Sequence, residues 1–355
     1  MFTHKPSSAT RAALATSHTK VHPRDALFES GEIAPSLPVC DHYSGVEARM
    51  KKSLELQGEL GPVFDVTLDG EDGAPVGGEV EHAHLIAELV NSAANQFGRV
   101  GARVQAVEHA AFEDMVDIIV GKAGARVAYI MVPKPRHLAD LQQAVQAIDA
   151  AIARHGVNRA IPIHTLIETH GALADVHAIA AQPRVESLSF GLMDFVSAHR
   201  GAIPQSAMGV KGQFEHPLVL RAKLEIAAAC HAHGKTPSHC VVTEFKHKAA
   251  LQEAATKACR QLGYTRMWSI HPDQILPVVE AFSPTSAEID LAVEILVAAQ
   301  AADWGPIRHH HNGQDQLHDR ASYRYFWHIL ERAHRTSMVH GAQLPAEVRL
   351  AFFSN

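Results

Sequence analysis

Short apolar runs alternate with longer periodic segments along the chain after residue 36. The short runs are rich in β-branched residues, and several are apolar at both odd and even positions, as expected of strands buried on both faces. Eight such runs predict strands at residues 37–40, 63–69, 102–107, 127–132, 161–168, 188–192, 240–245 and 267–270.

Helical periodicity fills the segments between these runs. Its clearest instance has apolar residues three and four positions apart, and it stops before Gly156. These residues are Leu138, Leu141, Val145, Ile148 and Ile152. A second helix is predicted from about residue 217 to Gly234. A third begins at Thr285, which forms a capping-box pattern with Glu288.

Eight strands, each followed by a helix, predict a closed (β/α)8 barrel, the TIM-barrel fold. An open doubly wound sheet is the competing fold, but it usually has a GxGxxG loop after its first strand, and this sequence has none. We expect an N-terminal arm at residues 1–36, the barrel at 37–303 and a C-terminal helical extension at 304–355. Within the extension, a polar linker at 304–318 leads to a last helix at about 319–334.

The composition changes this picture little. Of 355 residues, 46% are hydrophobic and 20% are charged, which excludes a disordered chain. A net charge of −6 without a long Lys/Arg run gives nucleic acid or a membrane surface little to bind. No stretch approaches the roughly 20 apolar residues of a membrane span.

Four cysteines are too few for a disulfide framework, so we expect reduced thiols and a cytoplasmic protein. The arm shares its composition with transit peptides, but a polar arm or oligomer strap is the favoured interpretation over organellar targeting.

Candidate chemistry follows from the barrel, because active-site groups lie at the carboxyl ends of its strands. Arg103 stands inside the third strand, where a guanidinium needs an anionic partner. The other candidates at strand ends are Asp69, Glu71, Asp72, Lys134, Glu168, Asp194 and His271.

Glu168 and Asp194 end neighbouring predicted strands, so their carboxylates can converge. Two carboxylates together with water and substrate oxygens are a usual environment of Mg²⁺. The alternative is that each residue only caps the helix that follows its strand, and spacing alone weighs the two interpretations evenly.

At these residues the sequence resembles the HpcH/HpaI aldolase and citrate lyase β-subunit superfamily, in its CitE-like branch of acyl-CoA lyases. The matching segments cover about residues 37–300, and their order and spacing together are specific. They are LDGEDGAP (68–75), ARV (102–104), VPKP (132–135), LIETHGAL (166–173), SFGLMDF (189–195), SIHPDQI (269–275) and FSP (282–284).

The resemblance implies roles for particular residues. Glu168 and Asp194 would bind Mg²⁺, with Mn²⁺ as a second possibility. Arg103 would bind the carboxylate or carbonyl end of the substrate beside the metal, whereas Glu71 and Asp72 would shape the surroundings of the ion. Lys134 and His271 are expected to contribute to substrate binding.

The resemblance also implies a homo-oligomer, a trimer or a hexamer. In such an assembly a C-terminal helix reaches a neighbouring subunit and supplies a catalytic aspartate, which corresponds here to Asp319. His318 and Ala321 depart from the family pattern around that position, and Gln105 stands where Asn is common.

Two other interpretations compete at single sites. Cys230, His231, His233, His239 and Cys240 suggest zinc, but their spacing matches no common structural zinc site, and the segment is expected at the stability face of the barrel. Lys134 could form a Schiff base, although an ionic contact to a carboxylate or to substrate is the more common role.

The sequence therefore predicts a Mg²⁺-dependent carbon–carbon lyase that acts on a short hydroxy-dicarboxyl-CoA thioester of the citramalyl-, malyl- or citryl-CoA type. One alternative is an HpcH/HpaI-type aldolase that uses the same metal pair on free 2-oxo-4-hydroxy acids. The other is a citrate lyase β-type subunit that works only with carrier and transferase partners.

Overall fold

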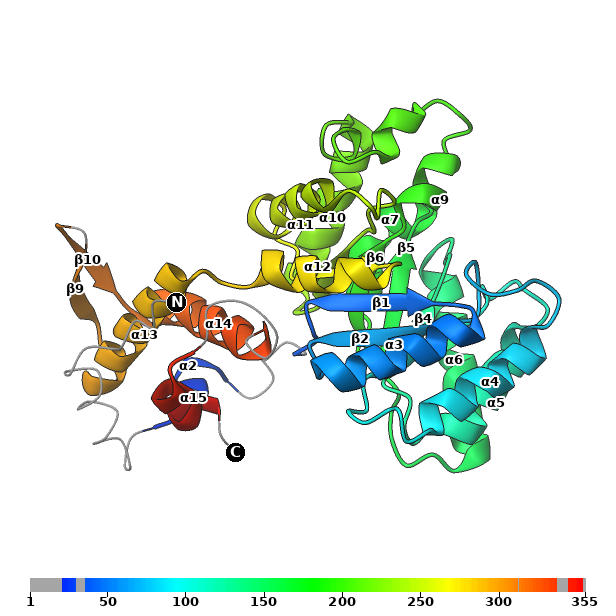
Figure 1. Ribbon diagram of the computed structural model, residues 1–355, viewed down its shortest axis with the longest axis horizontal. Coiled ribbons are helices and arrows are strands. Elements are labelled where there is room, and N and C mark those ends of the chain that lie inside the picture. The colour runs from blue at the N-terminus through cyan, green and yellow to red at the C-terminus, as the bar shows by residue number, and fades with distance from the viewer. Residues whose placement is uncertain (1–20, 30–35, 312, 337–343, 354–355) are drawn as a thin grey trace. The chain divides into compact units, whose positions relative to one another are not determined.

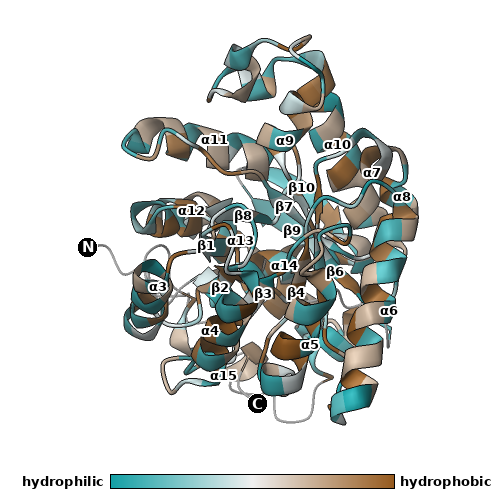
Figure 2. Cartoon of the chain, turned by 90° about the vertical axis from the view of Figure 1, so that its right-hand side faces the viewer, coloured by the Kyte–Doolittle hydropathy of each residue, from teal (hydrophilic) through white to brown (hydrophobic). Residues whose placement is uncertain are grey.

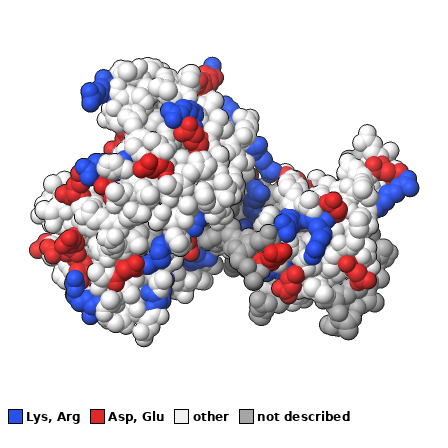
Figure 3. Space-filling view, turned by 180° about the vertical axis from the view of Figure 1, so that it is seen from behind, with Lys and Arg blue, Asp and Glu red and all other residues white. Residues whose placement is uncertain are grey.

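The structure of the chain is a computed structural model that describes residues 21–29, 36–311, 313–336 and 344–353. Contacts divide the chain into two compact units. The barrel unit is Ala34–Phe282, and the second unit combines Met1–Ile33 with Ser283–Asn355. No helix among the described residues is long and apolar enough to cross a membrane. Figure 3 shows acidic and basic side chains interspersed on the face that it draws.

Eight parallel strands close into a barrel in chain order, with β1 paired to β8 (Figure 1). The strands are β1 (Cys40–Ser44), β2 (Phe64–Asp69), β3 (Val100–Arg103), β4 (Ile130–Val132), β5 (Ile163–Ile167), β6 (Val185–Phe190), β7 (Thr236–His239) and β8 (Arg266–Ser269). The helices of this unit are α3 (Glu47–Leu60), α4 (Glu79–Asn91), α5 (Phe112–Ala123), α6 (Leu138–His155), α7 (His170–Ala174), α8 (Val176–Ala180), α9 (Leu192–Ser197), α10 (Pro217–Ala232), α11 (Lys248–Gln261) and α12 (Ile275–Phe282), with short 3₁₀ turns η1 (Gln205–Met208), η2 (Gly212–Phe214) and η3 (Pro272–Gln274). The predicted (β/α)8 barrel is confirmed.

The helices around the barrel are amphipathic, and Figure 2 shows both hydrophobic and hydrophilic colour on them. In α6, Leu141, Ala144 and Ile148 are buried on one face, as the spacing predicted. The helix ends at Gly156, whose left-handed φ of 65° glycine adopts without strain. The sequence pattern therefore places α6 against the barrel with its apolar side inward.

The interior of the barrel is unusually polar. Arg266 on β8 is fully buried and pairs with Asp41 at 2.9 Å and with Asp65 at 2.6 Å. The Thr67 hydroxyl donates to Asp41 at 2.7 Å, and the Tyr129 hydroxyl lies 2.7 Å from that of Thr67. Because a buried charge is costly unless it is paired, these residues lie together at the centre of the barrel.

Two predicted strands are misplaced because of this polar interior. The first strand is Cys40–Ser44 rather than 37–40, and the seventh is Thr236–His239 rather than 240–245. In both cases the hydrophobic pattern predicted the strand at apolar residues beside its true position. The strand itself carries polar residues that are buried inside the barrel.

The second unit is built from α2 (Pro23–Leu27), α13 (Ser286–Ala301), β9 (Ile307–His311), β10 (Gln314–His318), α14 (Arg320–Thr336) and α15 (Ala346–Phe353). The structure differs here from the predicted boundaries. The barrel unit ends at Phe282 instead of 303, and α13 belongs to the second unit. Residues 307–311 and 314–318 pair as antiparallel strands rather than forming a polar linker.

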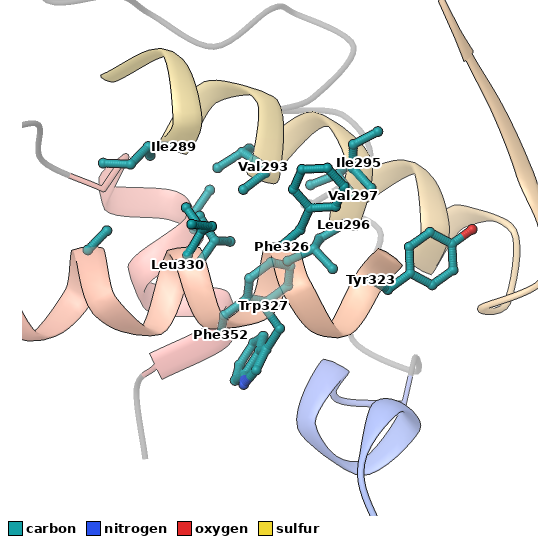
Figure 4. Packing of buried hydrophobic residues seen from close by; sticks show 14 of the residues in the cluster. Ile289, Val293, Ile295, Leu296, Val297, Tyr323, Phe326, Trp327, Leu330 and Phe352 are labelled. Atoms are coloured by element: carbon teal, nitrogen blue, oxygen red, sulfur yellow. The ribbon is translucent and has the colours of Figure 1, made fainter. Parts of the chain in front are cut away.

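The core of the second unit lies between α13 and α14 (Figure 4). Val293 and Leu296 of α13 face Phe326 and Leu330 of α14, and all four are buried. Trp327 points to the other side of α14, where it stacks on Phe353 of α15. The predicted capping box starts α13, since Thr285 accepts a hydrogen bond from the Glu288 backbone and the Glu288 side chain accepts one from Thr285 N. This unit therefore has a hydrophobic core of its own.

Candidate active site

Arg103, the last residue of β3, is held by acidic residues at the end of β2 and in the loop that follows it. Its Nε donates to Asp69 Oδ1 at 2.7 Å and its Nη2 to Asp69 Oδ2 at 2.6 Å, while Nη1 lies 3.0 Å from Glu71 Oε2. The Asp69 carboxylate also accepts from the backbone N–H groups of Glu71 and Gly73, both at 2.9 Å. Burial by itself would lower the pKa of Arg103, but Asp69 and Glu71 raise it, so the guanidinium is a fixed cation.

Lys134 joins the β2 loop to the carboxylates of the next strands. Its Nζ contacts Glu71 Oε1 and lies 2.9 Å from both Asp72 oxygens and 3.8 Å from Asp194 Oδ1. Burial would lower the pKa of Lys134, but Glu71 and Asp72 raise it, which keeps the amine protonated. The structure therefore favours the ionic role of Lys134 over the Schiff-base role, which needs a neutral amine.

Glu71 and Asp72 respond differently to this lysine. Burial raises the pKa of Glu71 despite its contacts with Arg103 and Lys134. Burial would also raise the pKa of Asp72, but hydrogen bonds from Lys134 bring it below its usual value. The predicted acidic pair thus surrounds Lys134 beside the predicted metal ligands.

Glu168 follows β5 directly and is buried, with 2% of its surface exposed. Its Oε1 accepts a hydrogen bond from Lys134 N at 2.8 Å. Burial raises the pKa of Glu168 to about 8, and the charge of Asp194 contributes to the increase. Gly191 makes room for it, since a Cβ at that position would lie 2.1 Å from Glu168 Oε2.

A cavity of about 160 Å³ lies beside these side chains at the carboxyl ends of the strands. Its polar lining includes Asp72, Arg103, Glu168, Asp194 and Thr243. The remaining lining residues are Gly191, Leu192, Met193, Met208, Cys240, Val241 and Trp268. Carboxylates, a guanidinium and apolar side chains therefore converge where a (β/α)8 barrel places its chemistry.

The donor set of this site fits a hard divalent cation. Five carboxylates, those of Asp69, Glu71, Asp72, Glu168 and Asp194, gather around two cationic side chains, Arg103 and Lys134. Among the described residues, no three His, Cys, Asp or Glu side chains form a closed metal cage. An ion held by Glu168 and Asp194 would keep water or substrate oxygens as its other ligands, which is the habit of Mg²⁺. Such an ion would also offset the excess negative charge.

Two predicted site residues are not among those that line the cavity. His271 is the N-cap of η3, where its ring stacks on Phe245 with centroids 4.7 Å apart, and it is not among the residues that line the cavity. Asp319 belongs to the second unit, where its Oδ1 accepts from Ala321 N at 3.0 Å and caps the start of α14.

Sequence reasoning missed several residues of the site. Tyr43 and Trp268 pack with tilted rings whose centroids are 4.6 Å apart, and the Tyr43 ring lies 5.5 Å from the guanidinium carbon of Arg103. Cys240 was expected at the stability face of the barrel, but it follows β7 and lines the cavity. Trp268 stands two residues before the IHP segment, which was a usable signal, whereas Cys240 was hidden by the misplaced seventh strand.

The geometry defines a (β/α)8-barrel enzyme with an acidic site at the carboxyl ends of its strands. A family model for the HpcH/HpaI aldolase/citrate lyase family matches residues 64–272. This is more than half of the chain, and the chain belongs to that family, as the resemblance implied.

Individual relatives agree with this assignment. The chain is 29% identical over 254 residues to an L-malyl-CoA/β-methylmalyl-CoA lyase of Cereibacter sphaeroides, which covers 67% of this chain and 77% of the relative. It is 52% identical to a citrate lyase from Burkholderia xenovorans LB400 whose crystal structure matches with a TM-score of 0.80, over 94% of this chain and 100% of that one. The predicted class of carbon–carbon lyase is thus confirmed.

The fold extends to more distant proteins. The CitE protein of Mycobacterium tuberculosis, solved in complex with magnesium, acetoacetate and coenzyme A, matches with a TM-score of 0.63 at 19% identity. That match covers 84% of this chain and 98% of the other.

Proposed function

We propose that this chain is a Mg²⁺-dependent lyase, with Mn²⁺ as an alternative ion, that cleaves a short hydroxy-dicarboxyl-CoA thioester of the malyl-, citramalyl- or citryl-CoA type. The products are acetyl-CoA, or a homologue, and a 2-oxo acid. The observation that carries the proposal is the single cavity lined by Glu168, Asp194 and Arg103. The likeness to an L-malyl-CoA/β-methylmalyl-CoA lyase supports an acyl-CoA substrate.

Cleavage needs a place for negative charge and a route for two protons. A base removes the proton of the substrate hydroxyl, the bond between the α- and β-carbons breaks, and its electron pair moves into the thioester as an enolate. The hydroxyl carbon becomes the carbonyl of the 2-oxo acid, and the enolate carbon then takes up a proton. A bound Mg²⁺ supplies Lewis-acid stabilisation of charge on oxygen.

The residues of the cavity are suited to distinct tasks. Glu168 and Asp194 would hold the ion. Arg103 lines the cavity with its guanidinium already oriented by Asp69, and its remaining N–H donors are available to a carboxylate or carbonyl oxygen. Lys134 binds Glu71 and Asp72 and so keeps these carboxylates from repelling the substrate.

Asp319 is proposed as the catalytic base that a neighbouring subunit supplies, in a homotrimer or homohexamer. Its carboxylate is exposed at the start of α14, which leaves one oxygen for a role besides the helix cap. Mixing two inactive variants, Asp319→Asn and Glu168→Gln, tests this role. Mixed oligomers regain activity if the aspartate acts in trans, since some sites then contain both intact residues, whereas activity that stays absent contradicts it.

The decisive experiment is a screen of the purified protein against malyl-, citramalyl- and citryl-CoA, with and without Mg²⁺, that measures the released 2-oxo acid. We expect Mg²⁺-dependent cleavage of at least one thioester and its loss in Glu168→Gln and Asp194→Asn. Asp149→Asn, at an exposed ion pair with Arg184, is the matched control and should stay active. Cleavage only of free hydroxy-oxo acids would favour the aldolase, a need for an acyl-carrier partner would favour the subunit, and full activity in EDTA would contradict the metal site.

A further inference from the structure

Lys223 of α10 is a fully buried lysine for which the described residues provide no carboxylate partner. Its Nζ donates to Gln213 Oε1 at 2.7 Å and to His239 Nε2 at 2.8 Å, and it lies 4.1 Å from the centre of the Phe214 ring. Burying an ammonium group among neutral partners is costly. Packing alone therefore does not explain a lysine at this position.

The contacts of Lys223 lead to the active-site cavity. Since an ammonium group only donates, His239 Nε2 must accept, and its proton lies on Nδ1, which donates to Cys240 O at 3.0 Å. The Cys240 thiol shares Gln213 Oε1 with Lys223, at 3.4 Å from Sγ. Cys240 in turn lines the cavity together with Val241 and Thr243, and we call these three residues the β7 wall.

The other two cations near the cavity each have carboxylate partners. Arg103 is paired with Asp69 and Glu71, and Lys134 is paired with Glu71 and Asp72. Lys223 alone among these three faces no carboxylate. Lys223 therefore adds a positive charge behind the β7 wall that no carboxylate of the described residues offsets, besides the N–H donors that Arg103 presents to the same cavity.

We propose that the β7 wall, backed by Lys223, is the subsite for the thioester end of the substrate, where the buried lysine stabilises the negative charge that develops on the thioester oxygen. This inference rests on the proposed lyase function and gives the substrate an orientation. The 2-oxo acid end lies toward Glu168 and Asp194, and the acyl thioester lies toward Cys240. Lys223 is a positioning residue, because it acts through Cys240 without lining the cavity.

The titration of this cluster gives a pH signature. Burial lowers the pKa of Lys223 to about 8. Three other titratable groups face Lys223. Burial and the charge of Lys223 lower the pKa of His239, which keeps its ring neutral. Burial raises the pKa of Cys240, which follows β7, and of Tyr264, which precedes β8. Lys257 of α11 lies 5.5 Å from the Phe214 ring and is the other cation nearby. Only Lys223 in this cluster is therefore expected to lose its charge between pH 7 and pH 9.

The test compares wild type, Lys223→Met, Lys223→Arg and the control Lys257→Met in the full-length, Mg²⁺-saturated enzyme. Measured quantities are kcat for thioester cleavage against pH, the Kd of the 2-oxo acid product, and the exchange of acetyl-CoA methyl protons with deuterated water. We expect Lys223→Met to lower kcat and the exchange rate about tenfold or more, because a nearby charge in a dry site is worth that much. The Kd of the oxo acid should change little, Lys223→Arg should keep most of the activity, and Lys257→Met should behave as wild type.

The pH profile provides a measurement that needs no variant. Wild-type kcat should fall as pH rises through about 8, and Lys223→Arg should move that fall to higher pH. A wild-type kcat that is flat to pH 10, or a folded Lys223→Met with wild-type kcat and exchange, overturns the subsite. If Lys223→Met does not fold, the pH dependence of kcat in the wild type and in Lys223→Arg still tests the proposal. Failure of the lyase function itself looks different, since the wild type then cleaves no thioester at any pH.

Discussion

Asp69 holds Arg103 by two parallel hydrogen bonds, Nε to Oδ1 at 2.7 Å and Nη2 to Oδ2 at 2.6 Å, inside the carboxyl end of the barrel. Both side chains are buried, with 3% and 6% of their surfaces exposed. Such a two-point pair fixes the plane of the guanidinium as well as its position. The orientation of the cationic side of the cavity therefore depends on a residue that does not line it.

Asp69→Asn removes the charge that compensates Arg103 and leaves only Glu71 as its acidic partner. We expect a loss of about 3 kcal/mol in the free energy of unfolding, since breaking a buried ion pair leaves an uncompensated charge. Denaturant titration measures it, with Asp117→Asn as control, because that carboxylate pairs with Arg154 at the surface and should cost less than about 1 kcal/mol. Equal losses in the two variants would contradict the buried role of Asp69.

Gly191→Ala places a methyl group where Glu168 now lies. The added Cβ would be 2.1 Å from Glu168 Oε2, so the carboxylate must move, although the backbone φ of −90° suits alanine. We expect kcat/KM to fall about 100-fold, the usual effect of a displacement of about 1 Å in an active site. Gly78→Ala is the matched control, because nothing lies within 4 Å of its added Cβ. Comparable activity in the two variants would show that Glu168 does not need its present position.

Leu330→Ala tests whether the second unit depends on its own core. Leu330 is fully buried between α13 and α14, and its truncation should cost about 2–5 kcal/mol through lost burial and a cavity. Limited proteolysis and thermal unfolding report the loss. Leu350→Ala is the control, since that side chain is 67% exposed and should change little. A thermal midpoint that is the same in both variants would contradict a packed core around Leu330.

The fold could be predicted because most strands and helices follow the hydrophobic rule. The capping box of Thr285 and Glu288 predicted the start of α13, and Gly156 predicted the end of α6. Where the barrel interior is polar the rule fails, as at β1, whose Asp41 pairs with Arg266 of β8. Pairing across the barrel is a long-range property that local hydrophobicity does not encode.

The candidate site was foreseen to a different degree. Strand-end position and family resemblance selected Glu168, Asp194 and Arg103, and the structure brings all three to one cavity. Spacing could not show that Asp69 holds Arg103, because the contact depends on how β2 and β3 pair in the sheet. Nor could it show the buried lysine behind Cys240, since Lys223 looks like an ordinary helix residue in the sequence.

Metal binding at Glu168 is predicted to depend on pH, because a cation and a proton compete for a carboxylate whose pKa is raised to about 8. The apparent affinity for Mn²⁺, measured by the electron paramagnetic resonance of the free ion, should rise about tenfold per pH unit up to about pH 8 and then level off.

For the metal-free protein, a raised pKa of Glu168 means that the folded state binds this proton more tightly than the unfolded state does. The resulting stabilisation is complete below the usual pKa of 4.5 and is lost as pH rises through about 8. Asp194→Asn removes the repulsion that helps to raise the pKa of Glu168. The pH at which the Mn²⁺ affinity levels off should therefore be lower in this variant, even though the variant binds the ion more weakly. An affinity that is the same at pH 6 and pH 9 would mean that Glu168 is ionised throughout, and the buried, proton-competed ligand would have to be abandoned.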